Sequence, residues 1–361
     1  MKSILVTGSA GFIGTNLVLR LLEGQEPVKI VGLDNLNDYY DPSLKEYRLS
    51  VILSKAKDLE AKGLPIEYQF VKGSIADREL LDRLFAEHHF DIVVNLAAQV
   101  GARNSLEQPQ AYVDSNVTGF LNVLEACRHS ICHSERSEES DYKGVRHLVF
   151  ASSSSVYGLN EKAPFAESDP TDRPVSVYAA TKKCDELLAH VYSQTYGLHV
   201  TGLRFFTVYG PWGRPDMAPM LFAKAICAGE PINVFNNGDL MRDFTYIDDI
   251  VEGIVRVMGR HAGPEERHSR LDRESHCPDP ASYAIYNIGG SHPVKLTDFI
   301  AALEEALGRK AIQRPMPMQP GDVPSTYADT SALERDFGFT PKISLREGLR
   351  RFAEWYKEYY G

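Results

Sequence analysis

Residues 3–24 read SILVTGSAGFIGTNLVLRLLEG, and this stretch decides the fold. The apolar run SILVTG predicts a buried strand, and FIGTNLVLRLLEG has the apolar spacing of a helix. Gly8, Gly11 and Gly14 stand at the junction between the two. Glycines at such a junction let a diphosphate approach the backbone at the helix N-terminus. The stretch therefore predicts a βα unit that binds a dinucleotide.

The first half of the chain continues this alternation of strands and helices. Apolar strands that are separated by helices predict a parallel sheet covered on both faces. We therefore expect an α/β fold of the Rossmann type, with a doubly wound parallel sheet and a smaller C-terminal α/β lobe. The further strands of the sheet are expected at residues 29–34, 66–73, 91–97 and 147–153, with helical segments at 76–89, 111–128 and 177–197.

Beyond about residue 205 the predicted elements are shorter and proline is more frequent. This change predicts a dinucleotide-binding domain over residues 1–205 and a substrate lobe over residues 206–361 that is discontinuous with it. Two polar segments without hydrophobic periodicity, residues 129–144 and 260–282, are predicted to be inserted surface loops.

The composition narrows the class of protein. A net charge of −10 argues against nucleic-acid binding, which requires a basic face. No stretch reaches the roughly 18 consecutive apolar residues of a membrane span. The N-terminus leads directly into a strand, and the five cysteines are scattered, so we expect a cytoplasmic protein with reduced thiols. No metal is predicted, because no known zinc spacing is matched by His129, Cys132 and His133 or by His276 and Cys277.

Tyr178 and Lys182 are four residues apart in the predicted helix 177–197, so they share one helix face. An ammonium beside a phenol favours the phenolate, which can then act as a general base for a hydroxyl group. The serines at 152–155 follow a predicted strand, where ligands bind in open α/β sheets. Each motif alone has an ordinary structural explanation. The Tyr–Lys pair could lie on the surface of an amphipathic helix, and the serines could hydrogen-bond the backbone of their own loop. Together they favour hydride chemistry on an alcohol.

Asp34 ends the second predicted strand. A carboxylate at this position accepts hydrogen bonds from the adenosine ribose and repels a 2′-phosphate. The cofactor is therefore predicted to be NAD, in preference to NADP.

With TGSAGFIG, the serine run and YAATK, the chain resembles the extended short-chain dehydrogenase/reductases, and among them the NAD-dependent nucleotide-sugar epimerases and dehydratases. The resemblance covers nearly all of the sequence outside the two insertions. It implies a tightly bound, recycled NAD and a C-terminal lobe that holds a UDP-sugar. It also implies that Tyr178 is the base, that Lys182 orients the nicotinamide ribose, and that Ser153 is the hydroxyl partner. The expected NAD-binding residues are Gly8, Gly11, Phe12, Ile13, Gly14, Asp34, Asn35, Ile75, Leu96, Ala97, Ala98, Tyr178 and Lys182.

Ser154 and Ser155 bear on the type of reaction, and either could replace Ser153 as the hydroxyl partner. In related 4,6-dehydratases an Asp-Glu pair occupies these two positions, and in UDP-glucuronate decarboxylases a Glu occupies the second. Elimination requires an additional acid and base, which this loop lacks. The sequence therefore favours simple epimerisation at carbon 4 of the sugar.

The segment RFFTVYGPWGRPDMAP, residues 204–219, bears on the sugar. It has Thr207 where UDP-galactose 4-epimerases have Asn. Together with LAAQVGAR, DNLNDYYDPSLK and RDFTYIDD, it is most similar to UDP-glucuronate 4-epimerases. Arg214 and Thr207 are suited to bind a C6 carboxylate, although Arg214 has an alternative partner in Asp216. The expected substrate-binding residues are Arg103, Ser154, Ser155, Thr207, Arg214, Arg242 and Asp322, of which Arg242 and Asp322 are assigned to UDP by resemblance.

The sequence thus predicts conversion of UDP-glucuronate to UDP-galacturonate through a transient 4-keto sugar. A 4-epimerase of UDP-glucose or UDP-N-acetylglucosamine is the alternative, followed by a UDP-glucuronate decarboxylase and a non-catalytic NAD-binding regulator. The intact Tyr178, Lys182 and serine run argue against the regulator. By resemblance, helices at 111–128 and 178–196 are candidates for a homodimer contact, although their apolar faces could also pack internally.

Overall fold

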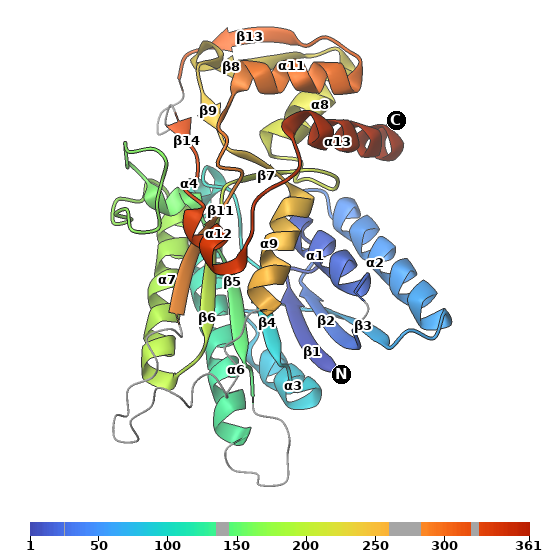
Figure 1. Ribbon diagram of the computed structural model, residues 1–361, viewed down its shortest axis with the longest axis vertical. Coiled ribbons are helices and arrows are strands. Elements are labelled where there is room, and N and C mark those ends of the chain that lie inside the picture. Colours follow the sequence, from blue (N-terminus) through green and yellow to red (C-terminus); the bar gives the residue numbers. More distant parts are fainter. Residues whose placement is uncertain (25, 135–143, 260–282, 319–324) are drawn as a thin grey trace.

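The computed structural model describes residues 1–24, 26–134, 144–259, 283–318 and 325–361. Within these residues, seven strands form one parallel sheet in the order β11-β6-β5-β4-β1-β2-β3 (Figure 1). The strands of this sheet are β1 (Lys2–Thr7), β2 (Val28–Asp34), β3 (Ile66–Lys72), β4 (Ile92–Asn95), β5 (His147–Ser153), β6 (Val200–Phe205) and β11 (Tyr283–Ile288).

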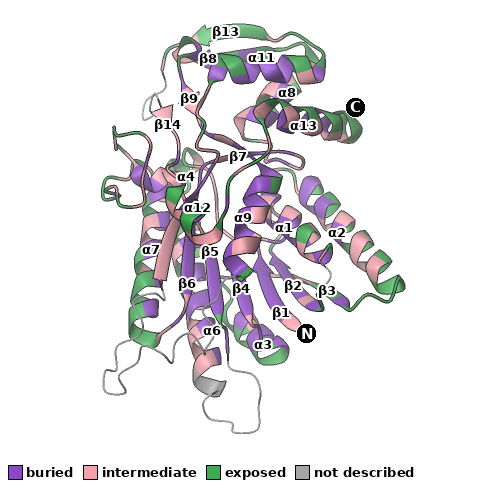
Figure 2. Ribbon diagram, in the orientation of Figure 1, coloured by how far each residue is buried: buried purple, intermediate pink, exposed green. Residues whose placement is uncertain are grey.

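Helices cover both faces of this sheet, because successive side chains of a strand point to opposite faces. Ile4 and Val6 of β1 pack in the core beneath α1, α2 and α9, whereas Leu5 packs in the core beneath α3, α6 and α7. Figure 2 shows the resulting pattern, with the central strands buried between helices whose outer sides are exposed. The helices are α1 (Phe12–Leu22), α2 (Ser43–Ala61), α3 (Arg78–His88), α6 (Gly119–Ser134), α7 (Val177–Tyr196) and α9 (Ile247–Gly259).

The second lobe lies beyond the carboxyl ends of the strands (Figure 1). Its core is continuous with the core beneath α1 and α9, since Met220, Phe299 and Phe352 belong to the same buried cluster as Ile4. The two lobes therefore form one packed body. The lobe comprises β7 (Thr207–Tyr209), α8 (Ala218–Ala228), β8 (Pro231–Phe235), β9 (Met241–Arg242), β10 (Phe244–Tyr246), β12 (Val294–Lys295), α11 (Leu296–Leu307), β13 (Ile312–Met316), β14 (Ser325–Thr326) and α13 (Leu345–Tyr360).

Shorter elements complete the described chain. Between β4 and α6 lie α4 (Asn104–Glu107), α5 (Pro109–Tyr112) and the π-helical segment η1 (Val113–Thr118). The other three are η2 (Ser154–Tyr157), η3 (Asn236–Gly238) and α12 (Ser331–Phe337), of which α12 packs on β11.

The predicted fold class is confirmed, with one local difference. Helix α6 continues to Ser134, so the predicted loop at 129–144 is wrong for its first residues. Within this extension, Ser130 donates to the Cys127 carbonyl oxygen and His129 lies 3.4 Å from Glu125, one turn earlier. The domain boundary at residue 205 stays a prediction, and β11, which follows it in the chain, completes the sheet of the first domain.

Three further expectations bear on the class of protein. No helix in the described part of the chain is long and apolar enough to cross a membrane. Cys127, Cys184 and Cys227 are free thiols. Across the described residues there is no group of three His, Cys, Asp or Glu side chains that could hold a metal ion. His276 and Cys277, and the side chains of Cys132 and His133, lie outside what the structure describes.

Candidate active site

A cavity of about 370 Å³ lies where the carboxyl ends of β1, β4 and β5 face the second lobe. In an open α/β sheet this edge is the usual place for a ligand. The cavity brings together most of the predicted site residues, which come from distant parts of the sequence. Those that line it are Gly8, Gly11, Phe12, Ile13, Gly14, Asp34, Asn35, Ile75, Leu96, Ala97, Ala98, Ser153, Ser154, Tyr178, Lys182, Thr207 and Arg214.

The glycine-rich loop forms one wall of the cavity. Gly8 has a φ of 67°, in the region that favours glycine, and a Cβ on Gly14 would lie 2.1 Å from the Gly8 carbonyl oxygen. Helix α1 begins directly after this turn, with no side-chain cap at Gly11 and no acidic residue in its first turn. The free N–H groups of that turn fit the diphosphate of a dinucleotide.

Asp34, at the end of β2, is buried in the same wall. Its Oδ2 accepts a hydrogen bond from the Ala10 N–H at 3.1 Å, and its Oδ1 accepts one from the Leu36 N–H at 2.9 Å. Each carboxylate oxygen has a second lone pair. The carboxylate is thereby fixed in place and keeps accepting capacity for ribose hydroxyl groups.

Tyr178 and Lys182 lie one turn apart at the start of α7. The helix begins at Ser176, whose hydroxyl accepts a hydrogen bond from the Ala179 N–H at 3.1 Å. The Lys182 ammonium is buried and donates to the carbonyl oxygen of Ala151, in β5, at 2.9 Å. This contact holds the first turns of α7 against the end of β5, so the tyrosine and the serine run face one cavity.

The second partner of Lys182 is Asp185, whose carboxylate lies 3.2 Å from the ammonium. Burial raises the pKa of Asp185 to about 7, although the neighbouring Lys182 acts to lower it. Oδ1 of Asp185 has no hydrogen-bond partner among the described residues. Of the three N–H donors of the ammonium, two are therefore taken by the protein and one remains for a ligand.

The four serines of the run have different surroundings. Ser152 donates to Glu186 at 2.7 Å, and its hydroxyl is therefore engaged. Ser153 Oγ accepts from the hydroxyl of Ser155 at 2.9 Å and, together with Ser154, lines the cavity. Ser155 is absent from the described lining of the cavity. Ser153 therefore stays the predicted hydroxyl partner, and Ser154 stays the alternative.

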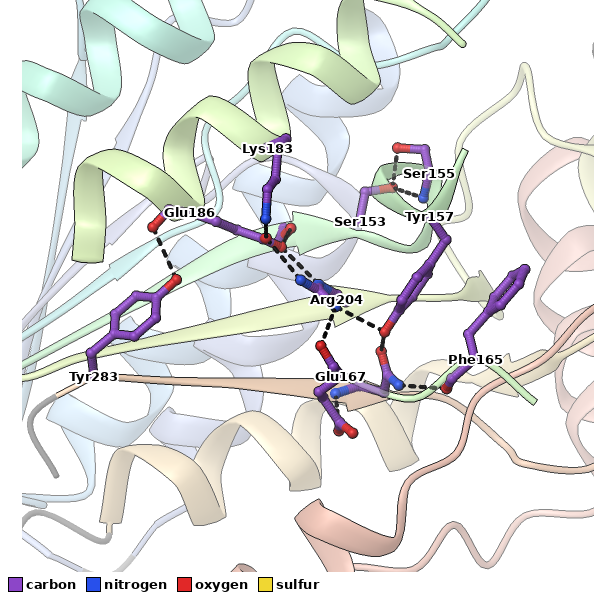
Figure 3. Close-up of polar contacts among 11 residues, drawn as sticks. Ser153, Ser155, Tyr157, Phe165, Glu167, Lys183, Glu186, Arg204 and Tyr283 are labelled. Carbon is purple, nitrogen blue, oxygen red and sulfur yellow. Dashed lines mark hydrogen bonds and ion pairs between the residues drawn. The ribbon is translucent and has the colours of Figure 1, made fainter. Parts of the chain in front are cut away.

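Beneath the serine run lies a buried ion pair between Glu186 of α7 and Arg204 of β6. Two guanidinium nitrogens of Arg204 donate to the carboxylate at 2.8 and 2.9 Å, and the Ser152 hydroxyl donates to the same group. Figure 3 shows Glu186 on one side of the guanidinium and Tyr157 on the other, where the Tyr157 hydroxyl lies 3.0 Å from Arg204. Burial acts to raise the pKa of Glu186, but the bonds from Arg204 and Ser152 outweigh it and hold the pKa below its usual value.

Thr207 and Arg214 form the wall on the side of the second lobe. Arg214 contacts Asp216 with two nitrogens, at 3.1 and 2.5 Å, and this was the alternative partner expected from the sequence. The Tyr39 hydroxyl donates to the same carboxylate at 3.1 Å. Burial, followed by the Asp216 charge, raises the pKa of Tyr39 to about 12, so its phenol stays protonated as a donor.

Comparison with known proteins shows the family. Residues 4–272 match the model of the NAD dependent epimerase/dehydratase family. This chain belongs to that family. The predicted enzyme class and the predicted NAD cofactor are those of the family, and the glycine turn, the uncapped helix and Asp34 fit that cofactor.

Two relatives and one solved structure resemble the chain along its length. Protein CapI of Staphylococcus aureus is 46% identical, over 99% of both chains. A probable UDP-glucuronate 4-epimerase of Rhizobium meliloti is 43% identical, over 99% of this chain and 97% of its own. The crystal structure of UDP-glucuronic acid 4-epimerase from Bacillus cereus, in complex with UDP-glucuronic acid and NAD, has a TM-score of 0.80. That structure is 30% identical and covers 99% of this chain and 100% of its own.

Besides Ser155, three predicted substrate residues of this epimerase/dehydratase are absent from the described lining of the cavity. Arg103 directly precedes α4, and Arg242 belongs to β9, which pairs with β12 and β14. Neither is part of the described cavity lining. Asp322 lies outside the described residues. The roles of all three stay predictions.

Sequence reasoning missed several residues of the site. Tyr39 and Lys45 line the cavity from the segment around the start of α2, and Gln99 lines it after β4. Asp185 and Glu186 follow Lys182 at helical spacings of three and four, which was the available signal for a contact. Their burial depends on β5 and β6, which the spacing alone does not show.

Proposed function

We propose that the chain is a UDP-hexuronate 4-epimerase that interconverts UDP-glucuronate and UDP-galacturonate. One observation carries the proposal: a single cavity joins Tyr178, Lys182 and Ser153 to Thr207 and Arg214. The first three residues supply proton transfer at a sugar hydroxyl, and the last two supply donors for a carboxylate. The names of the Rhizobium meliloti and Bacillus cereus relatives support the same reaction.

The proposed chemistry begins at the sugar O4, where the Tyr178 phenolate removes the hydroxyl proton. NAD, which the glycine turn and Asp34 would hold, would supply the acceptor and the donor for the C4 hydride. The Lys182 ammonium donates to Ala151 and to Asp185, and its remaining N–H can bind a ribose hydroxyl of the cofactor. The Ser153 hydroxyl hydrogen-bonds O4 and helps to relay the O4 proton to Tyr178, so that one proton in total moves from the sugar to the tyrosine. The 4-keto sugar turns in the cavity, and Tyr178 then returns the proton to O4.

A carboxylate on the sugar imposes one more requirement. The 4-keto uronate is a β-keto acid, which loses CO2 when its scissile bond aligns with the ketone. Fixed donors prevent that alignment by holding the carboxylate in one orientation. We assign this role to Thr207 with Ser154, which both line the cavity, and we assign the positive charge that pairs with the carboxylate to Arg214. We assign Arg242 to a phosphate of UDP and Asp322 to the hydroxyl groups of its ribose. We assign Arg103 to a supporting contact near the sugar.

One observation favours the alternative, a 4-epimerase of neutral UDP-sugars such as UDP-glucose or UDP-N-acetylglucosamine. Asp216 already accepts hydrogen bonds from Nε and Nη2 of Arg214, and the charges of the two side chains offset each other. Such a site could bind the uncharged hydroxymethyl group of a neutral sugar while Arg214 stays paired with Asp216. The two readings differ in whether a substrate carboxylate displaces Asp216.

We further propose a cytoplasmic homodimer. Leu187 and Val191 are exposed on the outer side of α7, and Leu121 is exposed on α6, which packs beside α7. An apolar stripe across two adjacent helices fits the same stripe of a second copy. Light scattering measures the mass: replacement of Leu187 and Val191 by Glu should convert a dimer to a monomer, and a wild-type monomer would refute the proposal.

The experiment that tests the reaction uses purified protein without added NAD. UDP-glucuronate and UDP-glucose are incubated separately, and products are resolved by anion-exchange chromatography. UDP-galacturonate from the first incubation alone supports the proposal and a retained cofactor. UDP-galactose from the second alone would favour the neutral-sugar reading, and a UDP-pentose would indicate decarboxylation. Tyr178→Phe should lower kcat by about 100-fold or more, and unchanged turnover would overturn the catalytic assignment.

A further inference from the structure

Arg48 of α2 is a fully buried arginine that links loops on two sides of the cavity. Its Nη1 donates to the Ala10 carbonyl oxygen at 3.1 Å and to the Tyr40 hydroxyl at 2.5 Å. Its Nη2 donates to the Trp212 carbonyl oxygen at 2.5 Å and lies 3.4 Å from that of Gly213. One planar guanidinium therefore ties α2 to two loops that are about 200 residues apart in sequence.

The first of these loops is the glycine-rich turn of the cofactor site. Ala10 lies between Gly8 and Gly11, and its N–H donates to Asp34 at 3.1 Å. The carbonyl oxygen of the same residue accepts from Arg48. The Ala10 peptide groups are thus bonded to Asp34, the residue expected to bind the cofactor ribose, and to Arg48.

The second loop leads into the candidate carboxylate site. Trp212 and Gly213 directly precede Arg214, and Trp212 has a φ of 59°, which a bulky side chain rarely adopts. A conformation of this kind persists only when its surroundings enforce it. The hydrogen bond from Arg48 to the Trp212 carbonyl oxygen is such a constraint. Because Arg214 follows two residues later, this bond also helps to fix the backbone position of Arg214.

The charge of Arg48 has no carboxylate partner among the described residues, because all four of its acceptors are carbonyl or phenol oxygens. A buried guanidinium without a counter-charge is unfavourable. It lies behind the turn whose N–H groups fit a diphosphate. A diphosphate in that turn would supply the missing negative charge, and the cation would in turn favour the diphosphate.

We propose that Arg48 is a positioning residue that couples cofactor binding to substrate binding. A bound dinucleotide stabilises the Arg48 charge and the Ala10 contact, and the same guanidinium then holds the Trp212–Arg214 turn ready for the sugar nucleotide. Coupling between two sites is reciprocal, so the sugar nucleotide should also strengthen binding of the dinucleotide.

The test uses Arg48→Met in a Tyr178→Phe background, which prevents turnover during titration. Calorimetry measures the Kd of NAD on NAD-free protein, and the Kd of UDP-glucuronate with and without NAD. In the parent we expect NAD to tighten UDP-glucuronate binding by about fivefold or more. In Arg48→Met this ratio should fall to about one, and the Kd of NAD should rise about 10- to 100-fold. Arg256→Met is the matched control, because Arg256 also donates to two consecutive carbonyl oxygens, of Phe337 and Gly338, outside the described cavity lining.

A purely structural role would lower the melting temperature while leaving the NAD-dependent ratio unchanged, and that result would overturn the proposal. If Arg48→Met fails to fold, Arg48→Lys keeps a cation but has one nitrogen in place of the two that Arg48 uses for the two loops, and it should also lower the NAD-dependent ratio toward one. A Lys variant with the parent ratio would equally overturn the proposal. This inference uses the proposed substrate only as a probe. The Kd of NAD requires no sugar, and UDP-glucose replaces UDP-glucuronate if the proposed function is wrong.

Discussion

The Lys182 ammonium lies 3.2 Å from the Asp185 carboxylate, and both side chains are almost completely buried. Two opposite charges in such a site stabilise each other, yet each loses its hydration. For Asp185 the loss of hydration dominates, since the pKa is raised from 3.8 to about 7. The acid beside the candidate catalytic lysine therefore titrates close to neutral pH.

The raised pKa predicts how stability depends on pH. Between about pH 4 and pH 7 the unfolded chain releases the Asp185 proton while the folded chain keeps it, so this group makes stability fall as pH rises. Asp185→Asn removes that dependence. The melting temperature of the variant minus that of the wild type should therefore increase from pH 5 to pH 8. A constant difference across this range would contradict the raised pKa.

The contact between Arg214 and Asp216 predicts two opposite effects on substrate affinity. Arg214→Gln should raise the KM for UDP-glucuronate by about tenfold, because a charge-assisted contact is lost at a partly exposed site. Asp216→Asn should lower the same KM, because it removes the carboxylate that competes for Arg214. UDP-glucose is the control substrate, and its KM should change by less than about threefold. Equal changes for both substrates would remove Arg214 from the carboxylate site.

The buried pair of Glu186 and Arg204 predicts a strong coupling in stability. Glu186→Gln leaves an unpaired guanidinium and should lower the free energy of unfolding by about 3–5 kcal/mol at pH 7. Adding Arg204→Met should restore part of that loss, because the unpaired charge is then removed. Urea unfolding of the two single variants and the double variant measures the coupling. Additive losses would show that the pair contributes nothing beyond its separate residues.

The glycine turn predicts a sharp difference between two alanine substitutions. In Gly14→Ala the new Cβ would lie 2.1 Å from the Gly8 carbonyl oxygen, so the turn must open and NAD should be lost on gel filtration. Gly259→Ala is the control, since a Cβ there meets nothing within 4 Å. Both proteins are assayed for released NAD after denaturation. Wild-type NAD content in Gly14→Ala would show that the turn does not hold the cofactor.

Much of this molecule could be predicted because the signals are local. The strand, glycine turn and helix of residues 3–24 follow one another in the chain, and so do Tyr178 and Lys182 on one helix turn. The structure extends α6 to Ser134, where polarity had predicted a loop, because a helix needs only its own backbone hydrogen bonds and a polar segment can continue it. The remote strand β11 joins the sheet through pairing with β6, a contact that no local pattern specifies.

The sequence by itself determined the fold class, the dinucleotide turn and the types of residue available for proton transfer, since these depend on hydrophobic period and on glycine, tyrosine and lysine at fixed spacings. Only the tertiary structure decided which charges meet. It joined Arg204 of β6 to Glu186 of α7, buried Asp185 behind Lys182, and set Arg48 between the Ala10 and Trp212 loops. The reason is physical: the partner and the hydration of a side chain depend on segments that are distant in sequence and become neighbours only when the chain folds.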